Sequence, residues 1–306
     1  MKEYDVIVIG AGPAGLTSAL YASRANLSVL ILDAGIYGGQ MNNTAAIENY
    51  PGFDSILGPE LSEKMYHSSI QFGAIYEYGL VNKIELQDNS KLVYTDDDVD
   101  RAKSVVIATG SKYKKLGIPG EEEFGGQGVS YCAVCDGAFF KNKKVYVIGG
   151  GDSAVEEAIY LSNLSSEVNI IHRRNKLRAQ KVIQERAFNN KKINFVWNTV
   201  VESIIGDETK VTNLKLKNVV SNDENIVNAD GVFIYIGEQP ITSPFINLGI
   251  TNSDGWIITD NNMHTSVPGI FAVGDVRDKN LRQIITATND GGIAGQQVFQ
   301  YLESLK

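Results

Sequence analysis

The two cysteines of this chain are separated by two residues, in the pattern Cys132-Ala-Val-Cys135. That spacing lets both sulfur atoms close one small ring, which a dithiol cycling between reduced and oxidised forms requires. The plain alternative is two isolated surface thiols, and a purely structural disulfide is disfavoured in a reducing compartment. A zinc site needs four ligands. The three histidines, His67, His172 and His264, are scattered singly along the chain, so no metal site is predicted.

A dinucleotide-binding pattern opens the chain. An apolar segment at 5–9 leads into the G-x-G-x-x-G sequence of 10–15, a helical run follows to residue 25, and the apolar segment 29–32 ends at Asp33. In such a unit the first glycine makes the turn, the second lets the backbone approach a pyrophosphate, and the third lets helix pack on strand. An ordinary strand-to-helix turn is the alternative. The predicted cofactor contacts are Gly10, Gly12, Pro13, Ala14, Gly15 and, for a ribose hydroxyl, Asp33.

The same pattern returns 139 residues later. The apolar segment 145–148 leads into a G-x-G-x-x-A sequence at 149–154, a helical run at 155–164 and a second apolar segment at 168–171. The chain therefore holds a duplicated dinucleotide-binding unit rather than a short-period repeat. The predicted contacts in the second copy are Gly149, Gly151, Asp152, Ser153 and Ala154.

Basic residues replace the acid at the end of the second copy. His172-Arg173-Arg174 follows the strand, with Arg178 four residues further on. Guanidinium groups pair well with phosphate, so this site is predicted to bind the 2′-phosphate of NADPH and to prefer it to NADH. A solvated basic patch is the alternative.

A third ligand contact is predicted at Gly274-Asp275, which ends an apolar segment within 268–275. Ligands of open α/β sheets bind at the carboxyl ends of strands. Arg282-Gln283-Ile284 then opens a predicted helix running towards Tyr301. Glycine normally destabilises a helix interior, so close packing against a ligand or a neighbouring chain is expected at three positions in it. They are Gly291, Gly292 and Gly295.

The order of these units predicts an α/β protein with two Rossmann-like domains. Apolar segments at 105–110 and 231–237 are interpreted as the strands that close each nucleotide-binding unit, with linkers at 111–116 and 237–243. The second domain is then inserted into a discontinuous first one. The expected boundaries are 1–113 for the first part, 114–243 for the insert and 244–306 for the second part.

Composition narrows the class of protein. The 306 residues are 43% hydrophobic and 21% charged, values typical of a globular chain. With 28 basic and 36 acidic residues the net charge is −8, which disfavours nucleic-acid binding because phosphate needs a basic footprint. The start of the chain shows no secretory signal, and no apolar stretch is long enough for a membrane helix. A cytoplasmic location is therefore expected.

Taken in order, these motifs resemble those of the low-molecular-weight bacterial thioredoxin reductases over essentially the whole chain. The Cys-x-x-Cys-Asp sequence just before the second nucleotide motif is the most specific element. The matching segments are 10–15, 38–40, 48–52, 132–137, 149–154, 172–174 with 178–179, and 271–276.

The resemblance implies a homodimeric enzyme in which NADPH reduces FAD, FAD reduces the Cys132–Cys135 disulfide, and the dithiol reduces thioredoxin. It implies that Cys135 faces the flavin and Cys132 attacks thioredoxin, with Asp136 as the general acid and base. It also implies rotation of the NADPH domain between half-reactions. Beyond the first glycine turn and Asp33, the implied FAD contacts are Gly39, Gln40, Asn49, Gly274, Asp275, Arg282, Gln283 and Ile284.

One residue departs from the family pattern, and other functions stay open. Asp152 stands where an asparagine is expected, and its charge beside a pyrophosphate is expected to weaken binding. The alternatives are a related FAD enzyme with ferredoxin as electron donor, an oxidase or reductase of small-molecule thiols, a reductase that serves a peroxidase, and a nucleotide-binding redox sensor. The arginines near Arg173 argue against the ferredoxin-dependent branch, which lacks the second nucleotide motif.

Overall fold

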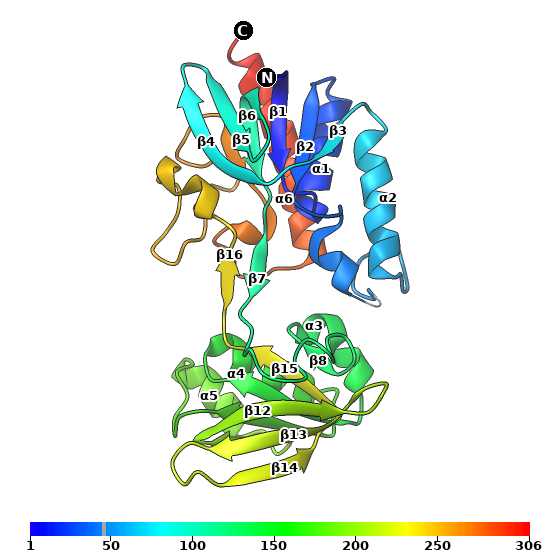
Figure 1. Cartoon of the computed structure of the whole chain (residues 1–306), viewed down its shortest axis with the longest axis vertical. Coiled ribbons are helices and arrows are strands. Elements are labelled where there is room, and N and C mark those ends of the chain that lie inside the picture. Colours follow the sequence, from blue (N-terminus) through cyan, green and yellow to red (C-terminus); the bar gives the residue numbers. More distant parts are fainter. Residues whose placement is uncertain (45–46) are drawn as a thin grey trace. The chain divides into compact units, whose positions relative to one another are not determined.

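The computed structural model describes residues 1–44 and 47–306. The chain divides into two compact units, one formed by Met1–Lys112 with Gln239–Lys306 and the other by Tyr113–Glu238. Figure 1 shows each unit as an α/β assembly with its own sheets and helices. The second unit is thus an insertion in the sequence of the first, and each is described separately below.

The first unit is built on a seven-stranded sheet. Its strands are β1 (Glu3–Ile9), β2 (Val29–Asp33), β3 (Ile75–Tyr78), β4 (Val81–Gln87), β5 (Ser90–Thr95), β6 (Val99–Ile107) and β17 (Ile270–Ala272). The order is β3-β2-β1-β6-β5-β4, with β17 paired to β6. The pairs that join β1, β2, β3, β6 and β17 are parallel, whereas β4, β5 and the start of β6 form an antiparallel edge. The carboxyl ends of the parallel strands therefore meet at one edge of the sheet.

Both faces of this sheet are buried, so its central strands are continuously apolar. Alternate residues of a strand point to opposite faces. Val6 and Val8 accordingly pack in one apolar cluster with residues of the covering helices, and Ile7 and Ile9 pack in another with Phe245. The helices are α1 (Pro13–Arg24), α2 (Gly58–Ile70) and α6 (Ile284–Glu303), with 3-10 turns at Gly39–Asn43, Ser243–Leu248 and Gly274–Val276.

The glycines of α6 pack against α1 of the same chain. A Cβ atom on Gly291 would lie 2.3 Å from the carbonyl oxygen of Ala14, and one on Gly295 would lie 2.6 Å from the Cβ of Tyr21. The expectation that a ligand or a neighbouring chain accounts for these glycines is therefore wrong for this pair. Their missing side chains let two helices far apart in the sequence approach closely.

The second unit has a parallel sheet of five strands and an antiparallel sheet of three. The parallel order is β11-β10-β9-β15-β8, and the antiparallel order is β12-β13-β14. The parallel strands are β8 (Val129–Ser130), β9 (Lys144–Gly149), β10 (Glu167–His172), β11 (Ile193–Trp197) and β15 (Gly231–Tyr235). The others are β12 (Thr199–Gly206), β13 (Val211–Asn218) and β14 (Glu224–Asn228). The helices are α3 (Ala133–Asp136), α4 (Asp152–Ser162) and α5 (Lys181–Phe188), with a 3-10 turn at Gly137–Phe140.

The chain passes between the units twice, through β7 (Ser111–Tyr113) and β16 (Glu238–Pro240), which pair as a two-stranded sheet. The second crossing falls earlier than the sequence-based boundary after residue 243. The reason is that the segment 239–243 is hydrogen-bonded to the first unit. The amide of Ile241 donates to the carbonyl of Gly110, and the carbonyl of Ile241 accepts from the hydroxyl of Thr109.

Within the described residues, no helix is both long and apolar enough to cross a membrane.

Candidate active site

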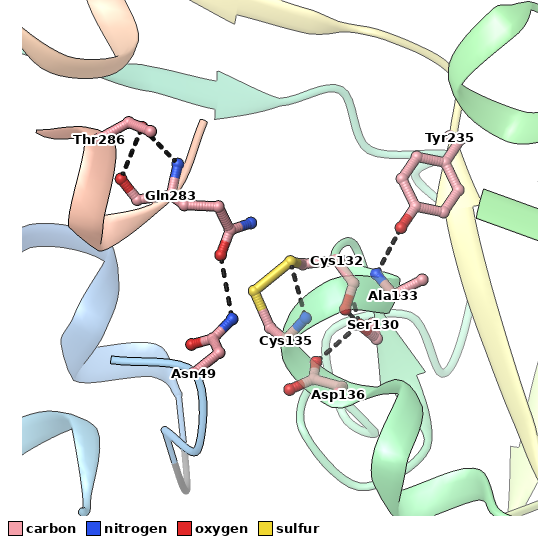
Figure 2. The surroundings of a disulfide bond; sticks show 9 residues. All are labelled: Asn49, Ser130, Cys132, Ala133, Cys135, Asp136, Tyr235, Gln283 and Thr286. Carbon is pink, nitrogen blue, oxygen red and sulfur yellow. Dashed lines mark hydrogen bonds between the residues drawn. A yellow bond between two sulfur atoms is a disulfide. The ribbon is translucent and has the colours of Figure 1, made fainter. Parts of the chain in front are cut away.

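Cys132 and Cys135 form a disulfide at the start of α3 (Figure 2). Cys132 is the residue that precedes the helix, and Cys135 lies in its single turn. The amide of Cys135 donates to the Sγ of Cys132 at 3.2 Å. A hydrogen bond to sulfur stabilises the thiolate, which is the reactive form of cysteine. This hydrogen bond distinguishes Cys132 from Cys135 within the pair.

A half-buried carboxyl group lies beside this disulfide. The hydroxyl of Ser130 donates to Oδ2 of Asp136 at 2.6 Å, and the Oγ of Ser130 accepts the amide hydrogen of Cys132 at 3.1 Å. Burial raises the pKa of the Asp136 carboxyl above its ordinary value, and the Ser130 hydrogen bond offsets part of that rise. A carboxyl group with a raised pKa holds its proton to higher pH and can deliver it to a departing thiolate.

Tyr235 anchors the redox helix from β15. Its hydroxyl oxygen accepts the amide hydrogen of Ala133 at 2.5 Å, as Figure 2 shows. Burial raises the pKa of Tyr235, so its hydroxyl stays protonated. The sequence analysis missed both Tyr235 and Ser130. Tyr235 is 100 residues from Cys135 in the sequence, so only the pairing of distant strands brings it to this position.

The first glycine turn fits a bound dinucleotide. A Cβ on Gly10 would lie 2.4 Å from the carbonyl oxygen of Ala108, and one on Gly15 would lie 1.9 Å from that of Gly10. These two glycines are therefore required by the packing of the turn. A Cβ on Gly12 would meet nothing within 4 Å. The open space at Gly12 is where a pyrophosphate is expected to approach the backbone.

Other expected FAD contacts surround this turn. Oδ2 of Asp33 accepts the amide hydrogen of Ala11 at 2.6 Å. A Cβ on Gly39 would lie 3.3 Å from the Cα of Gly12, and one on Gly274 would lie 2.8 Å from the Cβ of Ala14. The fold therefore brings Asp33, Gly39 and Gly274 together at the turn. Asp33 already holds the turn with one carboxylate oxygen, but a carboxylate has lone pairs left for a ribose hydroxyl.

The remaining expected FAD contacts lie around the start of α6. The amide of the Asn49 side chain donates to Oε1 of Gln283 at 3.1 Å, and Gln283 caps the helix together with Thr286 (Figure 2). Arg282 donates to the carbonyl of Asp275 at 3.4 Å and stacks 3.8 Å from the ring of Trp256. The helix begins at Ile284 rather than at Arg282. Elsewhere in this unit, the side-chain amide of Gln40 donates to the carbonyl of Ser111 at 2.6 Å.

The second glycine turn has the same construction. A Cβ on Gly149 would lie 2.5 Å from the carbonyl oxygen of Tyr235, whereas one on Gly151 would meet nothing within 4 Å. Ala154 is fully buried against Gly149, as its place in the motif requires. Ser153 is exposed in the first turn of α4. This turn therefore also offers open backbone to a pyrophosphate.

Asp152 has a structural role in this turn. Its Oδ1 accepts the amide hydrogen of Gln180 at 2.7 Å, and the carbonyl of Gly150 accepts the amide hydrogen of Arg178 at 2.7 Å. The segment that carries Arg178 is thus held against the glycine turn. An asparagine oxygen would accept the same bond, so the hydrogen bond does not explain the negative charge.

The basic residues divide into two kinds. Arg173, Arg174 and Arg178 are exposed, and no carboxylate in the described part of the chain forms an ion pair with them. His172 is only 5% exposed, and its ring packs beneath Gly150, where a Cβ would lie 2.3 Å from it. Burial lowers the pKa of His172, which keeps the ring neutral at pH 7. The arginines therefore suit an anionic phosphate, and His172 supports the turn.

Replacing Arg173 and Arg174 together by alanine is expected to raise the KM for NADPH by about tenfold or more and to narrow its advantage over NADH. Each lost charge-assisted hydrogen bond to a phosphate removes about 1.5–3 kcal/mol of binding. Steady-state kinetics with both nucleotides measure this. Lys181→Ala, at an exposed basic residue in α5, serves as the charge control. An unchanged preference for NADPH in the double variant would exclude these arginines from the site.

Comparisons with known proteins agree with this geometry. Residues 4–291 match the family described as pyridine nucleotide-disulphide oxidoreductase. The chain is 57% identical over 305 residues to a thioredoxin reductase of Listeria monocytogenes and 56% identical over 305 residues to one of Bacillus subtilis; each match covers 100% of this chain and 96% of the relative. The crystal structure of thioredoxin reductase from Streptococcus pyogenes superposes with a TM-score of 0.96 at 56% identity, covering 99% of both chains.

The chain therefore belongs to the pyridine nucleotide-disulphide oxidoreductase family. In this chain, two glycine turns accompany the disulfide-bonded pair Cys132–Cys135. Within the family, the chain belongs to the thioredoxin reductases. It is an FAD- and NADPH-dependent flavoprotein oxidoreductase, as the fit of the two glycine turns also indicates.

Proposed function

We propose that this chain transfers electrons from NADPH to the disulfide of thioredoxin, through FAD and the Cys132–Cys135 pair. The observation that carries the proposal is the disulfide at the start of α3 beside the half-buried carboxyl group of Asp136. We place FAD at the glycine turn that contains Gly12 and NADPH at the one that contains Gly151. When bound, the two cofactors supply the hydride and pass its electron pair to the disulfide.

The protein residues then carry out the thiol exchange. The electron pair breaks the Cys132–Cys135 bond and leaves the two sulfurs as thiolates. Asp136 acts as the general acid that protonates a departing thiolate and as the general base that removes that proton again. The Cys132 thiolate attacks one sulfur of the thioredoxin disulfide and forms a mixed disulfide. Cys135 then attacks the Cys132 sulfur, which restores the internal disulfide and releases thioredoxin as a dithiol. One disulfide is reduced for each NADPH oxidised.

A single spectroscopic titration tests this function. The purified holoenzyme is titrated with NADPH without oxygen, and oxidised thioredoxin is then added. We expect NADPH to bleach the yellow flavin absorbance and thioredoxin to restore it. A yellow protein that does not respond to NADPH would contradict the proposed donor and favour ferredoxin or a small dithiol instead. Bleaching without recovery would contradict thioredoxin as the acceptor.

We also propose that the second unit rotates about β7 and β16 between half-reactions. The nicotinamide and the dithiol both belong to this unit in the proposal, and each must reach the same flavin while the dithiol must also reach thioredoxin. One rigid arrangement does not serve all three contacts. A cross-link between the units, verified by peptide mapping, is expected to stop turnover and leave FAD bound. Undiminished turnover in the cross-linked sample would overturn the rotation.

We further propose that the enzyme is a cytoplasmic homodimer, as the resemblance to the family implies. A reducing compartment keeps such a dithiol available for turnover. Sedimentation equilibrium is expected to give twice the chain mass of 33.4 kDa. The mass of a single chain would contradict the dimer.

A further inference from the structure

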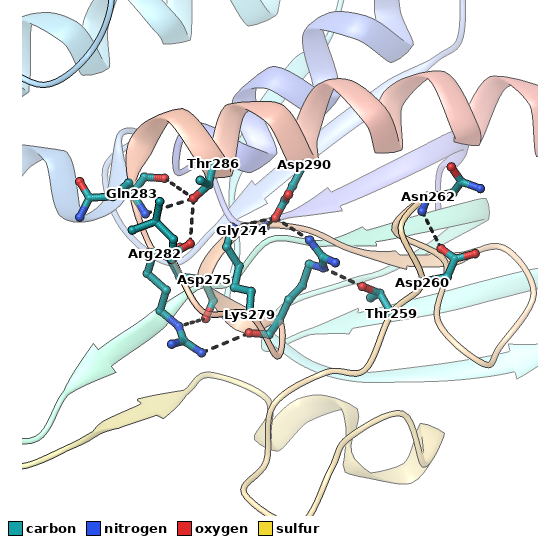
Figure 3. Close-up of polar contacts among 12 residues, drawn as sticks. Thr259, Asp260, Asn262, Gly274, Asp275, Lys279, Arg282, Gln283, Thr286 and Asp290 are labelled. Atoms are coloured by element: carbon teal, nitrogen blue, oxygen red, sulfur yellow. Dashed lines mark hydrogen bonds and ion pairs between the residues drawn. The ribbon is translucent and has the colours of Figure 1, made fainter. Parts of the chain in front are cut away.

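Three hydrogen-bond donors converge on one carboxylate oxygen of α6. Oδ2 of Asp290 accepts from the amide of Gly274 at 3.0 Å, from Nη1 of Arg277 at 2.9 Å and from Nζ of Lys279 at 2.9 Å. Figure 3 shows this carboxylate reaching from the helix to the segment that precedes it. None of the four residues was singled out for this contact by the sequence, although Gly274 was expected at the FAD site.

The cluster is almost completely shielded from water. The side chain of Asp290 is 6% exposed, that of Arg277 12% and that of Lys279 11%. Buried charges are tolerated only when they are paired and hydrogen-bonded. Nε of Arg277 also donates to the hydroxyl of Thr259 at 2.7 Å, which fixes the guanidinium on a second side. Removing the Asp290 carboxylate would leave the buried cations Arg277 and Lys279 without their anionic partner. The segment that carries them would then have to rearrange.

The residues that Asp290 binds lie on both sides of Asp275. Gly274 precedes it, and Arg277 follows it by two positions. Gly274 has a φ of +73° and packs so closely on Ala14 that a Cβ would lie 2.8 Å from the Ala14 Cβ. The carbonyl of Arg277 also accepts from the guanidinium of Arg282 at 3.3 Å. Asp290 therefore holds the segment 274–282 through the backbone amide of Gly274 and through the side chains of Arg277 and Lys279.

We infer that Asp290 is a positioning residue for the flavin: through Gly274 and Arg277 it holds Asp275 and Arg282 where they contact FAD. The inference rests on the proposed place of FAD in the first unit. An aspartate in the middle of a helix needs such a role, because its side chain otherwise competes with helix formation. The exposed acid Glu303, at the end of the same helix, pairs with Lys306.

The test is the rate at which the holoenzyme releases FAD, followed by the rise of flavin fluorescence after dilution. We expect Asp290→Ala to release FAD about tenfold faster, the effect of losing one charge-assisted contact. Val298→Ala is the matched control, since it removes core packing from the same helix eight residues further on. If Asp290→Ala loses thermal stability like Val298→Ala and releases FAD no faster than that control, the positioning role is wrong.

Two further variants separate this inference from the function it depends on. Asp275→Ala removes a proposed direct contact, so it must also speed FAD release if FAD binds here. Fast release in Asp275→Ala with normal release in Asp290→Ala would overturn only the role of Asp290. Normal release in both would overturn the place of FAD. If Asp290→Ala does not fold, Arg277→Met removes one of the two contacts through which Asp290 acts and leaves Lys279 paired with it, and we expect release a few times faster than in the wild type; an unchanged rate would again contradict the role.

Discussion

Replacing Cys135 with serine is expected to reduce the rate of thioredoxin reduction to less than about a thousandth of the wild-type value, because loss of a covalent nucleophile typically costs more than this. A serine oxygen cannot form the internal disulfide, so electrons that reach the protein cannot leave through Cys132. Bleaching of the flavin absorbance by NADPH is expected to persist, since neither glycine turn contacts the substituted sulfur in the proposal. Stopped-flow absorbance and a thioredoxin-coupled assay measure the two steps separately.

Cys132→Ser provides the companion measurement. It is expected to lose thioredoxin reduction to the same extent, because the exchange step starts from this sulfur. The chain has two cysteines, so each variant contains a single thiol that a thiol reagent can count, which verifies the sample. If either variant still reduces thioredoxin at the full rate, the dithiol assignment is wrong.

Asp136→Asn is expected to lower turnover by about 10²-fold while FAD and NADPH binding stay unchanged. General acid–base groups typically contribute about 10²–10⁴-fold, and an amide cannot supply the proton. Because burial raises the pKa of Asp136, its acid form persists to higher pH than that of an exposed aspartate. Wild-type turnover is expected to fall as pH rises through that pKa, and this fall should be absent in the variant. A pH–rate profile of each protein measures this.

Stability and the Ser130 contact give independent checks on the same carboxyl group. A folded-state pKa above the unfolded value means that the stabilisation is present at low pH and lost as pH rises through the folded-state pKa. Asp136→Asn should remove this loss from denaturation curves. The Ser130 hydroxyl lowers the pKa of Asp136, so Ser130→Ala should move the falling limb of the activity profile to higher pH. A limb that stays in place would remove Asp136 from the proton transfer.

Local sequence determined the parts of the site that depend on backbone geometry. A glycine turn between a strand and a helix needs Gly10 and Gly15 because side chains there would collide with the backbone. The collision at Gly15 is with Gly10 of the same strand–turn–helix unit, so spacing alone predicts it. The collision at Gly10 is with Ala108, which comes close because β6 pairs with β1. The Cys132–Cys135 pair is equally local, since the two cysteines are three positions apart along the chain and one helical turn brings their sulfurs together.

Only the tertiary structure shows which residues from distant parts of the chain form hydrogen bonds to the residues of that site. Tyr235 reaches Ala133 because β15 pairs beside β9 and β8 in the parallel sheet, and Asp290 reaches Gly274 because α6 packs on α1. The same packing explains Gly291, for which the sequence suggested a ligand or a second chain. Periodicity and motif spacing show which face of an element is buried but not which partner covers it. Partners contributed by remote segments, and the pKa that burial gives Asp136, therefore follow only from the folded chain.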